Sequence, residues 1–369
     1  MITSFEKADS ENINKEIMEK AAGILKKGGL VAFPTETVYG LGGDGMHKEA
    51  SAKIYAAKGR PSDNPLIIHI ADRKSLDEIA SEVSKKAEKL MDAFWPGPMT
   101  LIFRKKENVP MSTTGGLETV AVRMPSHPVA RELIRQSGVY IAAPSANTSG
   151  RPSPTKAEHV IEDLSGKIDM IIDGGSVGIG LESTIVDMSE DIPVILRPGY
   201  ITKEMLENVV GEVKVDPAIV GEAPKKNIIA KAPGMKYRHY APKGQMTIVE
   251  GDIDNVVAKI NELSKEKIAD GRNVAVIATD ETKYRYKYGT VKSIGSRKTE
   301  GSIAAGLYDI LRDMDHIGAQ DIYAESFSDD RLGGAIMNRM IKAAPPFHHQ
   351  SDKSYMKLHR AMATSLQIC

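Results

Sequence analysis

The sequence predicts two α/β domains, the first with a mixed sheet and the second smaller. Three observations support this prediction. At roughly 150 residues per domain, 369 residues suffice for two cores. Short apolar runs alternate with amphipathic stretches from Gly28 to about Val215. The rhythm then breaks over residues 216–243, which contain four prolines and many basic residues, and resumes beyond them.

The first domain is assigned to residues 1–215. Strands are expected at Leu30–Phe33, Leu66–Ile70, Thr100–Phe103, Val120–Arg123, Tyr140–Pro144, Met170–Asp173, Thr184–Asp187 and Val194–Leu196. Helices are expected at Lys48–Ala57, Ser84–Phe94, Pro128–Gln136, Thr155–Asp163 and Thr202–Val209. A short turn joins the last two strands, which favours a partly antiparallel sheet over a doubly wound parallel one.

Residues 216–245 are assigned to a linker and residues 246–369 to the second domain. Strands are expected at Met246–Glu250, Val274–Ala278 and Asp321–Ala324, and helices at Asn255–Glu266, Ser302–His316 and Gly334–Ala343. This alternation predicts a small, Rossmann-like, three-layer α/β domain. From His348 onward, a mobile tail or a last helix is expected.

Composition restricts the function classes. The chain has 49 basic and 49 acidic residues, so no global field draws it to nucleic acid or a membrane. The only cysteine is Cys369, which excludes an internal disulfide and a cysteine-based metal site. No apolar run approaches the ~18 residues of a membrane span, and the N-terminal sequence is too charged for a signal peptide. We therefore expect a cytoplasmic protein without membrane contact.

Neither of the usual glycine-rich phosphate loops occurs in the chain. The segment from Phe33 to Gly42 instead brings hydroxyls, a carboxylate and Tyr39 to a strand end closed by glycines. It fits a ligand site, or a polar turn whose threonines cap the next helix.

Two cations, Lys58 and Arg60, leave a helix with glycine between them and proline after them. A stiffened loop with two cations suits a polyphosphate, although both could merely complement the helix dipole. His69 alternates with apolar neighbours in the next strand, so it could be a core residue or a ligand.

Arg123 ends a strand, where it can hold a ligand carboxylate or pair with a protein acid. A later strand opens at Ala143 into a loop of serines, Asn147, glycine and prolines that leaves room for a ligand. Thr155 and Glu158, at the end of this loop, have the spacing of a capping box.

The motifs, in order, are PTETVYGLG, KGRPSDNPL, the Arg of VAVRMP, APSAN with SGRPSPT, ESTIVD and LRPG. Together they resemble the YrdC family of threonylcarbamoyl-AMP synthases over residues 15–210. The stretch APGMKYRHYAP at 232–242 and the domain that follows resemble the long two-domain form of that family. The resemblance implies a twisted sheet with a large concave, positively charged cleft. It also implies condensation of L-threonine, bicarbonate and ATP to threonylcarbamoyladenylate and pyrophosphate.

The resemblance also implies roles for individual residues. Around L-threonine it places Thr37, His69, Arg123, Ala143 and Ser183, where Ala143 can offer only backbone or packing. It assigns Lys58 and Arg60 the catalytic charge on the triphosphate. The other ATP residues it implies are Asn64, Thr119, Ser145, Ser153, Arg197 and Tyr237. Mg²⁺ is expected with ATP, without an assigned protein ligand.

The product would pass to a threonylcarbamoyl-transferase that modifies tRNA beside the anticodon, with weak or absent tRNA contact by this chain. One alternative is a non-catalytic module that binds double-stranded RNA. Another is a carbamoyl-transferring hydrolase or maturation factor, which should carry zinc-ligand segments that are missing here.

Two aromatic segments leave choices open. Tyr237, His239 and Tyr240 in the linker suggest an active-site lid, or simply docking of the linker between the domains. The run of Lys, Tyr and Arg at residues 283–288 suggests nucleic-acid contact, or an exposed edge strand.

Overall fold

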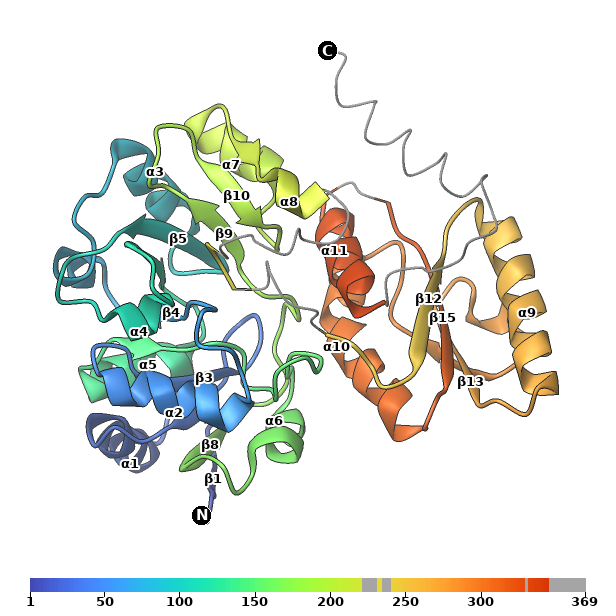
Figure 1. The fold of residues 1–369 in the computed structure, drawn as a ribbon, viewed down its shortest axis with the longest axis horizontal. Coiled ribbons are helices and arrows are strands. Elements are labelled where there is room, and N and C mark those ends of the chain that lie inside the picture. Colours follow the sequence, from blue (N-terminus) through green and yellow to red (C-terminus); the bar gives the residue numbers. More distant parts are fainter. Residues whose placement is uncertain (221–230, 234–239, 329–330, 345–369) are drawn as a thin grey trace.

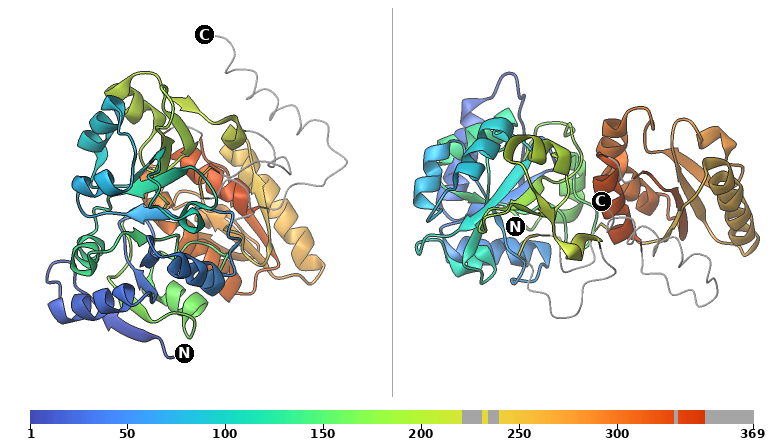
Figure 2. Two further views of the ribbon diagram at one scale, coloured as in Figure 1. Left: turned by 60° about the vertical axis from the view of Figure 1, so that its left-hand side comes forward. Right: turned by 90° about the horizontal axis from the view of Figure 1, so that it is seen from above.

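The chain folds around two separate β-sheets that lie in two adjoining bodies (Figure 1). The computed structural model describes residues 1–220, 231–233, 240–328 and 331–344. Seen from above, the helix layer of the second body faces the first body across a narrow boundary (Figure 2).

The first sheet contains eleven strands in the order β1-β8-β2-β3-β7-β4-β6-β5-β9-β10-β11. Their bounds are β1 Ser4–Lys7, β2 Val31–Phe33, β3 Gly40–Asp44, β4 Ile67–His69, β5 Met99–Arg104, β6 Thr119–Arg123, β7 Ile141–Ala142, β8 Met170–Asp173, β9 Thr184–Asp187, β10 Val194–Arg197 and β11 Lys214–Val215. The sheet contains both parallel pairs, such as β4 with β6, and antiparallel pairs, such as β9 with β10. The predicted mixed sheet is therefore confirmed, as is the antiparallel pairing expected for its short turn.

Helices cover both faces of this sheet. They are α1 Lys15–Lys26, α2 Lys48–Lys58, η1 Arg73–Glu78, α3 Lys85–Phe94, α4 Met111–Thr114, α5 Pro128–Ser137, α6 Ala157–Leu164, α7 Lys203–Val210 and α8 Pro217–Val220. Local signals set several of their ends. The Ser84 side chain accepts a hydrogen bond from Ala87 N at the start of α3, and Gly138 ends α5 with a φ of 61°.

Strand β2 shows how the sheet is buried on both sides. Phe33 packs in a core with Met18 of α1 and Leu133 of α5. Its neighbour Ala32 points the other way, into a core with Ile54 of α2 and other residues from α6. Because successive side chains of a strand face opposite sides, a fully apolar strand is suited to this central position.

The second sheet is smaller and entirely parallel, with the order β12-β15-β13-β14. Its elements are β12 Gln245–Val249, α9 Ile253–Ala269, β13 Val274–Ala278, η2 Lys283–Arg285, β14 Thr290–Ser293, α10 Glu300–His316, β15 Asp321–Glu325 and α11 Gly333–Ala343. Helix α9 packs on one face, while α10 and α11 pack on the other. The expected three-layer arrangement is thus confirmed.

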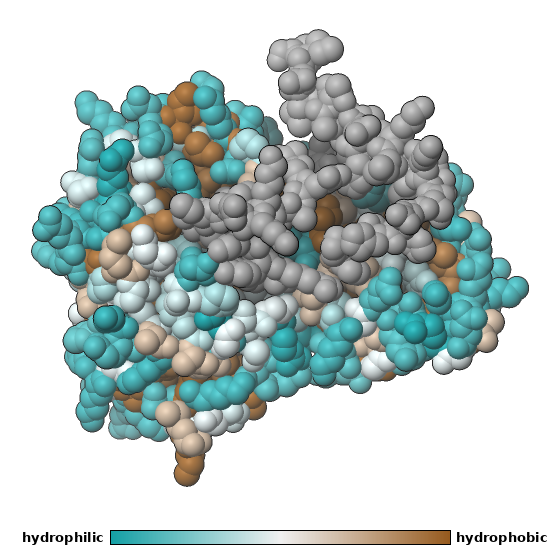
Figure 3. All heavy atoms as spheres, viewed as in Figure 1, coloured by the Kyte–Doolittle hydropathy of each residue, from teal (hydrophilic) through white to brown (hydrophobic). Residues whose placement is uncertain are grey.

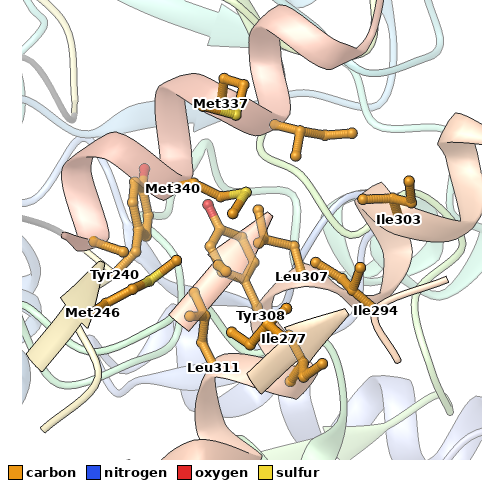
Figure 4. Packing of buried hydrophobic residues seen from close by; sticks show 14 of the residues in the cluster. Tyr240, Met246, Ile277, Ile294, Ile303, Leu307, Tyr308, Leu311, Met337 and Met340 are labelled. Atoms are coloured by element: carbon orange, nitrogen blue, oxygen red, sulfur yellow. The ribbon is translucent and has the colours of Figure 1, made fainter. Parts of the chain in front are cut away.

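The core under α10 and α11 also reaches the first domain. Leu307, Tyr308 and Met340 pack with strand residues of the second sheet, as Figure 4 shows. The same cluster includes Val38 and Leu181 from the first domain. The two domains therefore share a continuous apolar contact.

The edge strand considered for residues 283–288 is wrong. Residues Lys283–Arg285 form a short 3-10 helix, and Tyr286 is buried with its hydroxyl donating to Glu325 Oε1 at 2.7 Å. Lys283 pairs with Asp280, and Arg285 pairs with Asp254. Tyr286 is therefore committed to the domain core, whereas Tyr284 is 87% exposed.

The surface shown in Figure 3 is mainly hydrophilic, with apolar residues in small groups. Among the helices that the structure describes, none has both the length and the apolar character needed to cross a membrane.

Candidate active site

A cavity lies where the turn after β2, the ends of β4, β6 and β7, and the start of β9 converge. Its lining residues are Thr35, Val38, Gly40, Arg60, Ile67, His69, Arg123, Ala143, Pro144, Ser145, Asn147, Glu182, Ser183, Arg197, Pro233 and Tyr240. Three arginines and one carboxylate, that of Glu182, lie among these residues, together with several neutral hydrogen-bonding groups. The cavity is therefore suited to an anionic, polar ligand.

Many of the predicted site residues lie around this cavity. Those that line it are Arg60, His69, Arg123, Ala143, Ser145, Ser183 and Arg197. Those outside its lining are Thr37, Lys58, Asn64, Thr119 and Ser153. Thr119 begins β6, at the opposite end of that strand from Arg123. Tyr237 and His239, named for the lid, lie outside the described residues.

The polar turn after β2 is held by its own threonines. Thr35 Oγ1 donates to Val38 O at 2.7 Å and lies 2.9 Å from Thr37 Oγ1. The chain then enters β3 rather than a helix. The expected alternative of a helix cap is therefore wrong, and the turn instead forms one wall of the cavity.

Lys58 organises the loop that carries Ser145. It is buried at the end of α2, and its Nζ donates to the backbone oxygens of Ser145 and Asn147. Burial, followed by the charge of Arg60, holds the pKa of Lys58 well below its usual value. In this structure Lys58 acts on the loop backbone and does not face the cavity directly.

Arg60 lines the cavity, and hydrogen bonds to its own loop hold its side chain in place. Its Nη2 donates to Asn64 O at 3.3 Å and to Pro65 O at 3.1 Å. Burial lowers the pKa of Arg60 to about 10. Since both Lys58 and Arg60 donate to carbonyls outside α2, the simple helix-dipole explanation does not account for their placement.

Arg123 pairs with a protein acid that the sequence analysis did not assign. Its Nη2 lies 2.7 Å from Glu36 Oε1, and both side chains are largely buried. Burial alone would raise the pKa of Glu36, but Arg123 lowers it below the usual value. Arg123 Nε is buried without a hydrogen-bond partner among the described residues. The signal for Glu36 was its place within the polar turn.

His69 is both a buried residue and part of the cavity lining. Its Nδ1 donates to Ile67 O at 3.0 Å, and its ring meets Phe33 edge-on at 6.1 Å. Burial and the nearby Arg123 lower the pKa of His69 to about 3. The imidazole is therefore neutral at physiological pH and contributes hydrogen bonding rather than charge.

Ser183 lies immediately before β9 and is held by residues of β5 and β10. Its Oγ lies 2.7 Å from Thr100 Oγ1, and Arg197 Nη2 donates to it at 3.1 Å. Arg197 Nε also donates to Ser183 O at 3.0 Å. Burial lowers the pKa of Arg197, which lies within reach of the Glu182 carboxylate.

The loop after Ala143 is fixed by polar contacts. Ser145 Oγ donates to Asn147 Oδ1 at 2.5 Å, and Ser153 Oγ donates to Glu182 Oε1 at 2.6 Å. The capping box expected from Thr155 and Glu158 is wrong. Lys156 occupies the N-cap position of α6, and Thr155 N donates to His159 Nδ1.

Two described parts of the linker lie at the cavity. Ala232 is buried against the first sheet, and Pro233 lines the cavity. Tyr240 packs against Tyr308 of α10, with ring centroids 5.1 Å apart. Tyr240 therefore both docks against the second domain and lines the cavity, and the lid interpretation stays a prediction.

Within the residues that the structure describes, no group of three or more His, Cys, Asp or Glu side chains could hold a metal ion. Glu182, which lines the cavity, is paired with Arg339, and Glu36 is paired with the cavity-lining Arg123.

Known proteins resemble this chain over almost its full length. A family model described as "Telomere recombination", for the Sua5/YciO/YrdC family, matches residues 23–199. A second, described as "Threonylcarbamoyl-AMP synthase, C-terminal domain", matches residues 201–345.

Relatives named threonylcarbamoyl-AMP synthase occur in Bacillus subtilis and Pyrococcus abyssi. The first is 50% identical over 91% of this chain and 95% of its own length. The second is 49% identical over 90% of this chain and 96% of its own length. The crystal structure of P. abyssi Sua5 complexed with L-threonine superposes with a TM-score of 0.87 at 47% identity. That alignment covers 93% of this chain and 98% of the other.

Proposed function

This chain belongs to the threonylcarbamoyl-AMP synthase family in its long two-domain form, and we propose that it condenses L-threonine, bicarbonate and ATP. The products are threonylcarbamoyladenylate and pyrophosphate. The observation that carries the proposal is the convergence of Arg60, Arg123 and Arg197 with His69 and Ser183 on one cavity. The alignment of this chain with a threonine-bound relative supports it.

We propose that threonine occupies the end of the cavity near Arg123. Its carboxylate would meet the guanidinium, whose buried Nε has no partner among the described residues. Neutral His69 and the hydroxyls of Thr37 and Ser183 would surround the amine and the hydroxyl of threonine. Ala143 would contribute packing and backbone.

We propose that the triphosphate lies near Arg60. Lys58 would act on it mainly by holding the carbonyls of the Ser145 loop, which directs the other loop groups toward the phosphates. Asn64 and Ser153 would serve as neutral contacts. Arg197 and Tyr237 are proposed for the adenosine end, whereas Thr119 lies outside the cavity lining, at the other end of β6 from Arg123.

The residues present fit Mg²⁺ that arrives on ATP. The chain offers no cluster of carboxylates among its described residues, whereas Asn64 Oδ1 is buried without a hydrogen-bond partner there. Mg²⁺ commonly binds proteins through few side chains and substrate phosphates. Asn64 and Ser145 would hold it, and it would neutralise charge on the phosphates.

The reaction needs orientation and charge rather than a covalent nucleophile. The threonine amine adds to bicarbonate and water leaves, which gives a carbamate. A carbamate oxygen then attacks the α-phosphorus, and the bond to pyrophosphate breaks. Arg60 would stabilise the charge that develops on the phosphates, and Arg123 would fix the threonine.

We further propose a cytoplasmic role in tRNA modification. The product would supply the threonylcarbamoyl group to a transferase that acts beside the anticodon. The first domain, residues 1–215, would carry the chemistry, followed by the linker at 216–245 and the domain at 246–369. The balance of 49 basic and 49 acidic residues supports weak or absent contact with tRNA itself.

Pyrophosphate release tests this proposal. We expect release only when threonine, bicarbonate and ATP are all present, with threonylcarbamoyladenylate detected by mass spectrometry. Release that is indifferent to threonine would contradict it. Binding of double-stranded RNA without any pyrophosphate release would favour the non-catalytic alternative instead.

A further inference from the structure

The second domain reaches the cavity through one carboxylate, Glu182. Tyr308 of α10 donates its hydroxyl to Glu182 Oε2 at 2.7 Å and lies 2.9 Å from Oε1. Arg339 of α11 donates from Nε to Oε2 at 3.1 Å. All three side chains are buried. Figure 4 shows the Tyr308 ring in the apolar core with its hydroxyl at the end that lies toward Met340 and Tyr240.

Glu182 is also a direct neighbour of the proposed ATP groups. It lines the cavity and accepts the hydrogen bond from Ser153 Oγ at 2.6 Å. The next residue, Ser183, accepts both hydrogen bonds from Arg197. Since Glu182 contacts Ser153 directly and reaches Arg197 through its charge, a shift of its carboxylate would disturb mainly groups proposed for ATP.

The contact of Glu182 with the second domain also affects the charge in the cavity. Arg197, Arg339 and Lys342 all lie within electrostatic reach of Glu182. Arg339 makes the ion pair with Glu182, while Arg197 directs its hydrogen bonds to Ser183. Without Arg339, the buried carboxylate would attract Arg197 away from Ser183 and would present a negative charge to the triphosphate.

We infer that Tyr308 and Arg339 are positioning residues for the active site, which the second domain thereby completes. They hold Glu182 and neutralise it, so that Arg197 and Ser153 remain available to ATP. This inference rests on the proposed function, and it assigns the second domain a part in ATP binding.

Steady-state kinetics of the full chain test the inference, with Arg339→Met, Glu182→Gln and the double variant. We expect Arg339→Met to raise KM for ATP about tenfold while KM for threonine changes less than about twofold. The double variant removes both charges, so its KM for ATP should return to within about threefold of wild type. Such a rescue is not expected if Arg339 only docks the domains.

The matched control is Lys156→Met. Lys156 Nζ lies 2.7 Å from Asp309 Oδ2 across the same domain boundary, but neither residue lines the cavity. Lys156→Met should leave the KM values for ATP and for threonine unchanged. Thermal unfolding of every variant reports folding, and Tyr308→Phe replaces Arg339→Met if the latter does not fold. Tyr308→Phe should also raise KM for ATP, by a smaller factor than Arg339→Met.

The outcomes separate the two proposals. The inference would be overturned if Arg339→Met altered kcat and both KM values together, lowered the melting temperature, and was not rescued in the double variant. An unchanged KM for ATP in both Arg339→Met and Tyr308→Phe would also overturn it. A wild-type chain that releases no pyrophosphate would instead contradict the proposed function.

Discussion

Replacing Arg60 by methionine should lower kcat/KM for ATP about a hundredfold while leaving the fold intact. Methionine keeps much of the side-chain volume but removes the charge and the donors. In the protein without ATP, Arg60 has two opposing effects on stability. Burying its charge costs free energy, and its hydrogen bonds to the loop carbonyls recover free energy.

The pKa of Arg60 gives the size of the first effect. Burial lowers it from its ordinary value to about 10, which corresponds to about 3 kcal/mol at 1.36 kcal/mol per pKa unit. Arg60 is partly exposed, so solvent screens the charge and about 3 kcal/mol is an upper value. A bound triphosphate would remove this cost, and 2 to 3 kcal/mol corresponds to roughly a hundredfold in affinity.

The second effect is the loss of hydrogen bonds from Nη2 to Asn64 O and Pro65 O. These bonds contribute about 1 to 3 kcal/mol each. Their loss and the relief of the buried charge have opposite signs and similar size. We therefore expect the free energy of unfolding of the variant to stay within about 2 kcal/mol of wild type.

Pyrophosphate release at varied ATP, together with urea unfolding, measures both quantities. Arg60→Lys keeps a charge without the planar fork and should fall between wild type and Arg60→Met. Arg104→Met, a replacement of an exposed arginine on β5, serves as the control for a lost positive charge. If Arg60→Met keeps wild-type kcat/KM for ATP, Arg60 does not bind the triphosphate.

Three further predictions concern pH and specificity. The pKa of Glu182 is lowered from 4.5 to about 2, so the ionised carboxylate should contribute about 3 kcal/mol to the free energy of unfolding above pH 4.5, and this contribution should be lost as pH falls toward 2. The stability of Glu182→Gln should therefore fall less steeply with acid than that of wild type. Identical acid-unfolding curves would contradict this. Because the pKa of His69 is about 3, kcat/KM for threonine should show no inflection from this residue between pH 5 and 8, and wild type and His69→Gln should give profiles of one shape. Since the proposed site hydrogen-bonds the threonine hydroxyl, serine should be a poor substrate and 2-aminobutyrate at least about a hundredfold worse than threonine; equal rates would exclude that contact.

Sequence patterns predicted the elements whose burial follows a simple period. Helix α5 has proline in its first turn and glycine after its last, and its apolar face is regular. Strand β3 was missed because its sequence GLGGD is typical of a turn. The structure shows why glycine is required there: a Cβ at Gly42 would lie 2.7 Å from Ile141 and 2.8 Å from Phe33.

Other missed elements have different causes. Strand β1 is an edge strand with alternating partial exposure, and β14 is short and carries Lys292, so neither stands out as an apolar run. Helix α1, in contrast, has the usual signals. Asn14 caps it, and its buried residues recur at helical spacing. It could have been recognised from the sequence.

The site was predicted only as far as its motifs allow. Motifs identified Arg60, Arg123 and Arg197 as candidates, but they did not indicate that Arg123 pairs with Glu36 or that Lys58 holds a loop backbone. These contacts depend on how separate segments meet around the cavity. A residue type and its neighbours in sequence do not specify which partner it finds in space.

The contact between the domains shows this most clearly. Glu182 finds Tyr308 and Arg339 at sequence separations of 126 and 157 residues, and nothing in the sequence of either domain marks them as partners. Burying such an ion pair is costly, and well-packed apolar side chains would often stabilise a protein as much or more. Apolar residues would, however, allow the domains to slide. Directional bonds from Tyr308 and Arg339 to one carboxylate fix α10 and α11 relative to Ser153 and Ser183. The cost of the buried charges is therefore understandable if the second domain must hold the active site in one arrangement.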